Sequence, residues 1–445
     1  MKKIILFVAA SLALASCNKD DDFGGNSALQ PVNFSVNLNY DQSLGGDVVN
    51  GGSVTLTNTN TGDIYTAVSN ENGIVNFAQI LPGSYNLTAT QTLSASEFST
   101  TFGYAPETEM VAFNGSQEQV LVNANVMATS VVLKSARIGD LVIKQIYYAG
   151  SHAQQGAVFR DQFIEIYNNS NEVIYADGLL IGQLHGKANT TVNSFSLPNG
   201  QFDWSKSIGM PLTGPNANTN FVYADYIMKI PGNGTQYPIQ PGESIVIAQT
   251  AINHTQPLID NNGDPVAIQN PALTIDLSTA DFEAYLGDYR LSIGEDVYQW
   301  DIQNPAVTDV DLAFWGGTNK DLILDNLGRD SFIIFRDENV ASYPQFPSPD
   351  VTSITSTTKY FKQIPVNLVI DGVDLQHHNP NSQRPKMLQS EVDASFIGGD
   401  ASFNSQSVIR KTKTTINGRK VLEDTNNSSV DFVKLAKAEP RGFAQ

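Results

Sequence analysis

The sequence predicts an all-β protein made of two β-sandwiches in tandem, a small one near the N-terminus and a larger one after it. Apolar and polar residues alternate with period two over many short segments, as is typical of strands with one buried face. The 445 residues include 34 Gly and 20 Pro, so turns interrupt the chain at short intervals. With 41% hydrophobic and 16% charged residues, the chain is apolar enough to bury more than one core.

Residues 1–16 predict a lipoprotein signal peptide. Lys2 and Lys3 precede an apolar run over 4–15, which is too short to span a bilayer as a helix. The run ends in Leu14-Ala15-Ser16-Cys17, which resembles the lipobox of bacterial lipoproteins. The resemblance implies that Cys17 is acylated, becomes the first residue of the mature chain and binds membrane lipid. The alternative is a secretory signal peptide that happens to contain a cysteine.

An acidic segment follows within residues 17–30, which we expect to form a linker. Lys19, Asp20, Asp21 and Asp22 resemble the export signal that sends lipoproteins of Bacteroidota to the outer face of the outer membrane. The resemblance implies a lipid-anchored outer-membrane protein on the cell surface. A solvated acidic linker is the alternative.

Residues 31–133 predict the first sandwich. Phe34, Val36 and Leu38 alternate with polar residues, and the pattern returns in later segments. Asn72-Gly73 suits a tight hairpin and Pro82-Gly83 the centre of a type II turn. This order of strands and turns resembles the carboxypeptidase-regulatory-like, or Cna-B-like, modules. The resemblance implies an immunoglobulin- or prealbumin-like sandwich that serves as a spacer.

Residues 134–445 predict a larger and less regular sandwich. The strand Phe163–Asn168 runs into an Asn-rich turn, and Val173–Tyr175 leads through Asp177-Gly178 into Leu179–Ile181. This order resembles the lamin-tail domain, an immunoglobulin-like sandwich of bacterial surface proteins. With the C-terminal blocks around Ser407–Lys411 and Asp424–Ser429, the whole chain resembles a family of Bacteroidota lipoproteins of unknown function.

Two long intervals, 186–236 and 249–321, depart from a plain lamin tail and are expected to be insertions. One contains the only helix that the sequence predicts. Ser278 suits an N-cap with Asp281 three residues on, and Phe282, Tyr285 and Leu286 share one face, so we expect a helix that ends near Gly287.

The charge limits the choice of partner. A net charge of −19 argues against binding to nucleic acid through the bulk surface. The stretch from His377 onward carries +3, so the rest carries −22. A basic tail on an acidic body favours internal charge matching over a nucleic-acid arm.

The sequence contains no nucleophile elbow, nucleotide fingerprint or thiol site, so we expect no catalytic residue. Asp260, Asn262 and Asp264 place oxygens around a glycine bend and could bind calcium, although an ordinary Asx turn explains the same residues. We expect no other cofactor.

Four residues are candidates for a ligand platform. Trp204 and Trp315 could stack on a sugar ring or an apolar ligand, and the alternative is that they are buried anchors of irregular loops. His377 and His378 form the best titratable pair, although surface or packing roles are the favoured explanation for them.

These observations predict a surface-exposed binding or adhesion protein that is not an enzyme, with an extracellular glycan or protein as its ligand. The alternative is an accessory lipoprotein that captures a ligand for a TonB-dependent β-barrel importer of the outer membrane.

Overall fold

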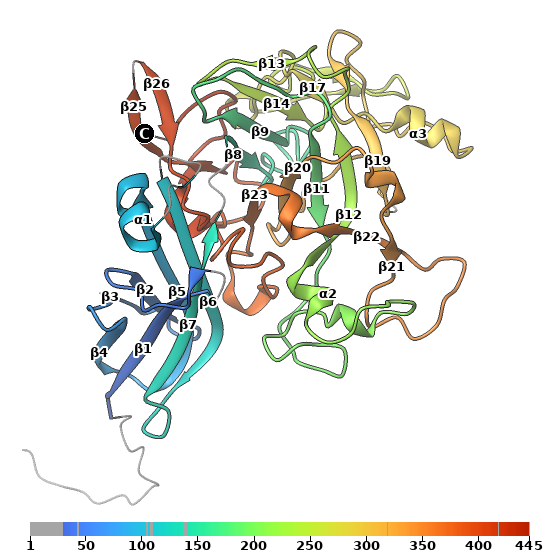
Figure 1. Ribbon diagram of the computed structural model, residues 1–445. Helices are drawn as coiled ribbons and strands as arrows, with labels where there is room; N and C mark the ends of the chain where they lie inside the picture. Colours follow the sequence, from blue (N-terminus) through green and yellow to red (C-terminus); the bar gives the residue numbers. More distant parts are fainter. Residues whose placement is uncertain are drawn as a thin grey trace, which may run out of the picture.

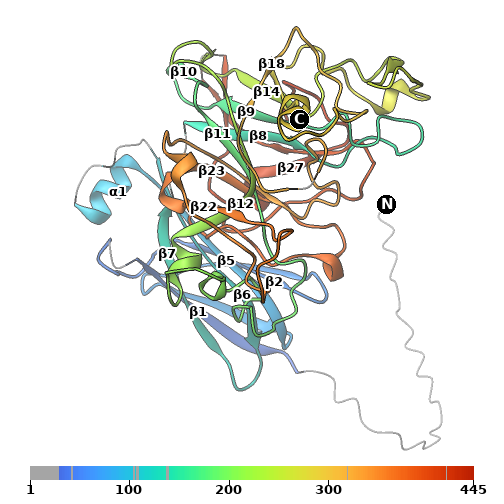
Figure 2. The ribbon, with the colours of Figure 1, turned by 90° about the vertical axis from the view of Figure 1, so that its right-hand side faces the viewer.

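The computed structural model shows an all-β protein, as the sequence predicts. It describes residues 30–444 apart from 42–43, 104–105, 107–109, 137–139, 318 and 417. The predicted signal peptide, Cys17 and the acidic segment at 19–22 lie outside the described residues. Figures 1 and 2 both place an N-terminal sandwich, in blue, below a larger part formed by the rest of the chain.

The N-terminal sandwich contains seven strands in the order β3-β2-β5-β6-β7-β1-β4. All its neighbouring strands are antiparallel except β1 and β7, which are parallel. Phe34, Val36 and Leu38 of β1 are buried, which confirms the alternation that the sequence predicts. The strands are β1 (Val32–Tyr40), β2 (Ser53–Asn58), β3 (Ile64–Val68), β4 (Ile74–Ile80), β5 (Gly83–Ser94), β6 (Met110–Val122) and β7 (Ala128–Ala136).

Two turns of this sandwich differ from those predicted. Gly73 has a φ of +72°, but Asn72-Gly73 closes no hairpin, because β3 pairs with β2 whereas β4 pairs with β1. The turn connects β3 and β4, the strands at the two ends of the strand order. The Asn70 side chain stabilises it by accepting hydrogen bonds from the backbone N–H groups of Asn72 and Ile74. Pro82-Gly83 is not a type II centre, since Gly83 begins β5 and lacks the positive φ that such a turn requires.

A helix that the sequence analysis does not predict, α1 (Ala95–Phe102), connects β5 to β6. Ser94 and Glu97 form a capping box, in which the Glu97 carboxylate accepts from the Ser94 N–H at 2.8 Å. The helix ends at Gly103, whose φ of +79° ends the helical path. Phe98 is buried in the core of the sandwich and Phe102 packs against the same core, so two aromatic side chains hold this short helix in place.

The larger part is built on two seven-stranded sheets. The first has the order β21-β22-β12-β11-β20-β23, with β19 also paired to β12, and the second has the order β18-β17-β14-β9-β8-β24-β27. The strands of the first sheet are β11 (Leu180–Leu184), β12 (Phe221–Lys229), β19 (Asp311–Trp315), β20 (Ser331–Phe335), β21 (Gln345–Phe346), β22 (Phe361–Pro365) and β23 (Val369–Asp374). Those of the second are β8 (Leu141–Tyr147), β9 (Phe163–Asn168), β14 (Ser244–Ala248), β17 (Phe282–Glu283), β18 (Thr308–Asp309), β24 (Ser407–Arg410) and β27 (Phe432–Leu435).

Short elements connect these strands. Three two-stranded ribbons are formed by β10 (Ile174–Tyr175) with β13 (Pro238–Ile239), β15 (Leu258–Ile259) with β16 (Pro265–Val266), and β25 (Thr412–Ile416) with β26 (Arg419–Leu422). The other α-helices among the described residues are α2 (Asn216–Thr219), α3 (Gly287–Ser292) and α4 (Ser428–Asp431). None of the described helices is both long and apolar enough to cross a membrane.

The main core lies between the two large sheets. Phe332 and Ile334 of β20 face this core, together with Ile164 and Ile166 of β9. The next residues of β20, Ile333 and Phe335, are buried in a second cluster on the other face of the first sheet. This sheet is therefore covered on both faces, which explains why the segment Phe332–Phe335 of β20 is a continuous apolar run.

The intervals 186–236 and 249–321 are not simple insertions. The first contains β12, a central strand that pairs with β11, β22 and β19. The second contains β17, which extends the other sheet by pairing parallel to β14. Because β12 is buried on both faces, it lacks the alternation by which the sequence analysis finds strands.

The prediction of a helix near 278–287 is wrong. Phe282 and Glu283 form β17, and α3 begins at Gly287, where that helix was expected to end. The Asp281 carboxylate accepts a hydrogen bond from the Val246 N–H at 2.7 Å and does not support a helix cap at Ser278. The Ala284 N–H donates a hydrogen bond to the Ala248 carbonyl. The edge of β14 therefore satisfies the backbone groups that a helix would have paired internally.

Internal charge matching of the basic C-terminal stretch is confirmed. Arg410 is buried and donates to three carboxylates, those of Asp371 at 2.7 Å, Asp424 at 3.1 Å and Asp431 at 3.2 Å. A guanidinium can stay charged in the interior only with such partners. The other basic residues of the stretch that form ion pairs are Arg384, Lys386, Lys413, Lys434 and Arg441.

Polar contacts join the two parts of the molecule. The Asn114 side-chain amide of β6 donates to the Thr425 carbonyl at 2.5 Å, and Lys134 of β7 forms an ion pair with Glu391 at 3.2 Å. The strands that carry Asn114 and Lys134 therefore form the face of the N-terminal sandwich that meets the larger part.

Candidate functional site

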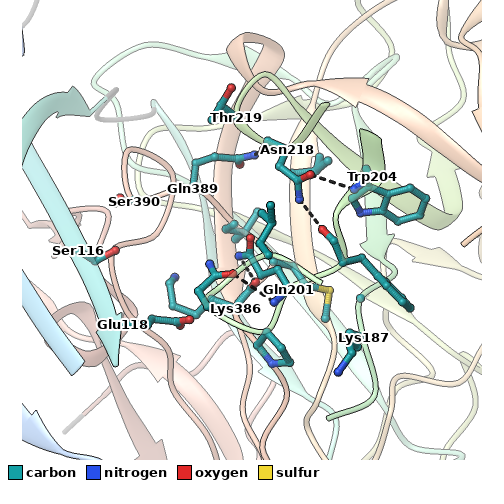
Figure 3. A pocket seen from close by; sticks show the side chains of 18 of the residues that line it. Ser116, Glu118, Lys187, Gln201, Trp204, Asn218, Thr219, Lys386, Gln389 and Ser390 are labelled. Carbon is teal, nitrogen blue, oxygen red and sulfur yellow. Dashed lines mark hydrogen bonds between the residues drawn. The ribbon is translucent and has the colours of Figure 1, made fainter. Parts of the chain in front are cut away.

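A cavity of about 570 Å³ lies where the N-terminal sandwich meets the larger part (Figure 3). The sandwich supplies Lys134 and the stretch 116–119 of β6. The larger part supplies the end of β11, the loops 197–204 and 385–391, and the segment 215–223 that contains α2. Ligand sites often lie at such domain junctions, and this volume falls within their usual range.

A β-bulge places Glu118 in the cavity wall. The pairing of β6 with β5 shifts register between Leu87 and Tyr85, so that Glu118 and Gln119 stand opposite Asn86. Gln119 has a φ of +55°, and its N–H donates to the Asn86 side chain at 3.3 Å. Bulges re-aim side chains in this way at sheet edges and next to functional sites.

Glu118 and Lys386 lie in the same part of the wall (Figure 3). The Lys386 ammonium donates to the Asp374 carboxylate at 2.8 Å and to the carbonyls of Asp393 and Ser395. Burial raises the pKa of Glu118 to about 7, although the positive charge of Lys386 opposes the shift. Burial lowers the pKa of Lys386, but the surrounding carboxylates outweigh it, so the pKa of Lys386 is raised overall.

Side-chain amides form the wall facing this pair. The Asn218 side chain accepts a hydrogen bond from the backbone N–H of Trp204 at 3.0 Å and donates one to the Phe202 carbonyl at 2.7 Å. Gln389 donates to the carbonyls of Asn218 and Phe221. The Gln389 Oε1 atom is buried and has no hydrogen-bond partner among the residues that the structure describes. An unpaired buried acceptor is costly, so this atom indicates a place for an external donor.

Aromatic rings support the wall from behind. Trp204 is only 5% exposed and stacks on Tyr223, with 3.6 Å between ring centroids. His185 stacks on Phe361 at 3.6 Å, and its Nε2 lies 3.0 Å from the Ser348 hydroxyl. Burial, followed by the charges of Arg384 and Lys359, lowers the pKa of His185 to about 3, so this imidazole is neutral.

The structure separates the four residues expected to form a ligand platform. Trp204 lines the cavity but acts as a buried anchor, since Tyr223 covers its face. Trp315 is half-buried in β19 and stacks on Tyr226 in the main core. His377 and His378 stack on each other at 4.2 Å, with His377 buried and His378 exposed. The four residues therefore do not share a site.

The residues considered for calcium form an Asx turn between β15 and β16. The Asp260 carboxylate accepts from the N–H groups of Asn262 and Asp264 at 3.0 and 2.9 Å. Gly263 has a φ of +88°, which completes the bend. Within the described ranges, no three His, Cys, Asp or Glu side chains are grouped so that they could hold a metal ion.

Glu118, Lys386 and Gln389 were not predicted from the sequence. Glu118 lies in the polar run Gln117-Glu118-Gln119, which looks like a solvated strand end. The loop 385–391 carries no motif. Only the docking of two distant segments brings these side chains together, so no local signal could have identified them.

Comparisons with known proteins relate a segment of the larger part to a family. Residues 240–439 match the model of a family described as protein of unknown function (DUF4876). Over these residues the chain is similar to that family. The matched segment contains the loop 385–391 of the cavity, whereas β6 lies outside it.

A solved structure is similar to this chain over nearly its full length. The crystal structure of a DUF4876 family protein from Bacteroides thetaiotaomicron is 25% identical, with a TM-score of 0.52, and the match covers 93% of this chain and 98% of that one. The similarity therefore also extends over the N-terminal sandwich, beyond the matched residues 240–439. No curated protein matches the sequence.

Two further structures are much less similar. Fervidolysin from Fervidobacterium pennivorans, a keratinolytic enzyme related to subtilisin, is 13% identical with a TM-score of 0.19, over 57% of this chain and 34% of that one. A DUF3823 family protein from Bacteroides ovatus is 10% identical with a TM-score of 0.15, over 49% of this chain and 98% of that one.

Proposed function

We propose that this protein is a surface-displayed outer-membrane lipoprotein that binds an extracellular glycan without transforming it, in the cavity between its two parts. The observation that carries the proposal is the wall of that cavity, which combines amide and hydroxyl side chains with apolar and aromatic ones and includes the unpaired acceptor of Gln389. An anchor at Cys17 would present this cavity outside the cell.

The charges of the wall favour a neutral ligand. Lys134 is paired with Glu391, and Lys386 with Asp374. Lys187 donates to the Asn189 carbonyl at 2.9 Å and to Thr191. Since these three cations already have partners, an anionic ligand would gain little from them. A hydroxyl-rich neutral molecule suits the remaining donors and acceptors, which include Ser116, Gln117, Thr219 and Ser390.

The same geometry supports a non-catalytic role. The Lys386 ammonium donates hydrogen bonds to three acceptors, which stabilise its charged form, so this residue is poorly suited to act as a base. His185, which also lines the cavity, is held neutral by burial and stacked on Phe361. Binding by shape and hydrogen bonds is what this wall offers.

The N-terminal sandwich has more than the spacer role that its resemblance to Cna-B-like modules implies. Its β6 strand supplies one wall of the cavity, and Lys134 joins it to the opposite side. Ligand binding therefore depends on both parts staying together.

A glycan array with neutral oligosaccharides tests the proposal, followed by calorimetry with the best ligand. Ser390→Trp places a large side chain at the cavity wall, and no hydrogen bond of the Ser390 side chain is lost in the described structure. We expect this variant to bind at least tenfold more weakly than the wild type, because the indole occupies the space of the ligand.

Ser96→Trp is the matched control, since Ser96 is an exposed residue of α1 outside the cavity. It should bind like the wild type. Full binding by a folded Ser390→Trp variant would remove the cavity from the proposal. Failure of the wild type to bind any neutral glycan would overturn the ligand class.

A further inference from the structure

A second cavity, of about 270 Å³, lies in the larger part of the molecule and shares no lining residue with the first. Three segments enclose it: 156–160 before β9, 250–268 after β14, and 300–302. Its wall is mainly apolar, with Ile252, Ile268 and Trp300 among the lining side chains. This volume is slightly below the usual range for drug-sized ligands, so it suits a small molecule.

His254 supplies an unsatisfied acceptor in this wall. The residue is fully buried, and its Nε2 lies 3.0 Å from the Thr250 carbonyl. This contact places the ring proton on Nε2, so Nδ1 is an acceptor. Nδ1 finds no hydrogen-bond partner in the part of the chain that the structure describes. Burial lowers the pKa of His254 to about 4, which keeps the ring neutral.

The one charged group in the wall is already neutralised. Arg160 forms an ion pair with Asp321, and its guanidinium also lies 4.7 Å from the Phe159 ring centroid and 5.9 Å from that of Trp300. An anion would therefore meet a positive charge that Asp321 already compensates, and a cation would find no carboxylate among the described residues of the wall. The cavity favours a neutral ligand.

The backbone beside the cavity is strained. Val158 has a φ of +64°, which is unfavourable for a β-branched residue. Such conformations cost about 1–3 kcal/mol and are found most often at ligand-binding and active sites. The strain therefore agrees with a functional role for this wall.

We propose that this cavity binds a small, neutral, apolar molecule with a single hydroxyl donor, in particular a phenol, with His254 Nδ1 accepting the hydrogen bond. The ring of a phenol would contact the apolar wall, and its hydroxyl would satisfy the buried acceptor. This site is separate from the glycan cavity, so the two proposals can fail independently.

Calorimetry on the full mature chain with p-cresol and p-xylene tests the proposal. The two molecules have the same shape and differ by a hydroxyl in place of a methyl group. Without the hydrogen bond to His254, p-xylene should bind more tightly than p-cresol, because removing a methyl group from water costs less free energy than removing a hydroxyl group. We expect p-cresol to bind at least about threefold more tightly, as one net hydrogen bond allows. Equal or tighter binding of p-xylene, or no binding of either compound, would overturn the proposal.

A cavity-filling variant locates the site. Val266→Phe should reduce p-cresol affinity at least tenfold, and Ile302→Trp should do the same from another wall. Val68→Phe, at a position 61% exposed on β3, is the matched control and should bind like the wild type. Circular dichroism establishes that each variant is folded. If both folded cavity variants bind p-cresol like the wild type, the cavity is not the site.

Discussion

Glu118 shows how its environment sets the chemistry of a single residue. A nearby lysine would ordinarily lower the pKa of a carboxyl group, but Lys386 is itself engaged by Asp374 and two carbonyls. The desolvation of Glu118 is therefore the larger effect, and its pKa rises to about 7. At neutral pH the carboxyl group is divided between its acid and its carboxylate, so it can donate or accept a hydrogen bond at the cavity wall.

Glu118→Gln should make stability less dependent on pH. Because the folded state raises the pKa of Glu118 from 4.5 to about 7, the folded state binds a proton more tightly than the unfolded state does. The resulting stabilisation is complete below about pH 4.5 and is lost as the pH rises through about 7. Between pH 5 and pH 8, we expect the wild type to lose on the order of 2–3 kcal/mol more free energy of unfolding than the variant does.

Urea denaturation at the two pH values measures this difference. Glu71→Gln, at an exposed position, is the control and should follow the wild type. If Glu118→Gln shows the same pH dependence as the wild type, the buried environment of Glu118 is not the source.

At the scale of the element, strands that alternate were predictable and strands buried on both faces were not. β1 is polar on one face and was predicted. β12 is buried on both faces and fell within an interval taken for an insertion. The Phe282–Glu283 segment carries a helical pattern, yet the free edge of β14 made it a strand. Local pattern decides an element only when no neighbouring strand competes for its backbone.

Gly73→Ala tests the turn that crosses between the edges of the N-terminal sandwich. A methyl group at Gly73 would lie 2.6 Å from the Leu38 carbonyl oxygen, in addition to the strain of a positive φ. We expect the free energy of unfolding to fall by about 3 kcal/mol or more.

Gly62→Ala separates the two effects. Gly62 has a similar φ of +76°, but no atom lies within 4 Å of the added methyl group. This control should cost only about 1–2 kcal/mol, as left-handed strain alone does. Equal losses in the two variants, measured by chemical denaturation, would show that the close approach to Leu38 is unimportant.

At the scale of the whole molecule, the cavity exists because two sandwiches dock. Neither β6 nor the loop 385–391 encloses a site alone, and the contacts of Asn114 and Lys134 hold the two together. The buried charges of the larger part follow the same rule, since the three carboxylates that pair with Arg410 come from a strand, a loop and a helix.

Surface display is tested on intact cells. If Cys17 carries lipid and the segment Lys19–Asp22 directs export, added protease should degrade the protein while a periplasmic marker survives. Cys17→Ser should abolish acylation and release the protein from the membrane fraction, with intact-mass analysis as the readout. Resistance to protease until the outer membrane is broken would contradict surface display, and an unacylated wild-type N-terminus would contradict the anchor.

The sequence by itself determined the all-β class and the alternating strands of the N-terminal sandwich, because these depend on local periodicity and composition. Its charge distribution predicted that the basic C-terminal stretch is matched internally, but the fold decided which carboxylates pair with it. The sequence also carries the predicted anchor, which depends on a short motif. The tertiary structure alone decided the two cavities. Glu118, Lys386 and Gln389 converge only when the sandwiches dock, and His254 becomes an unpaired acceptor only when burial removes water from its ring. Burial and long-range contact create chemistry that no stretch of neighbouring residues encodes.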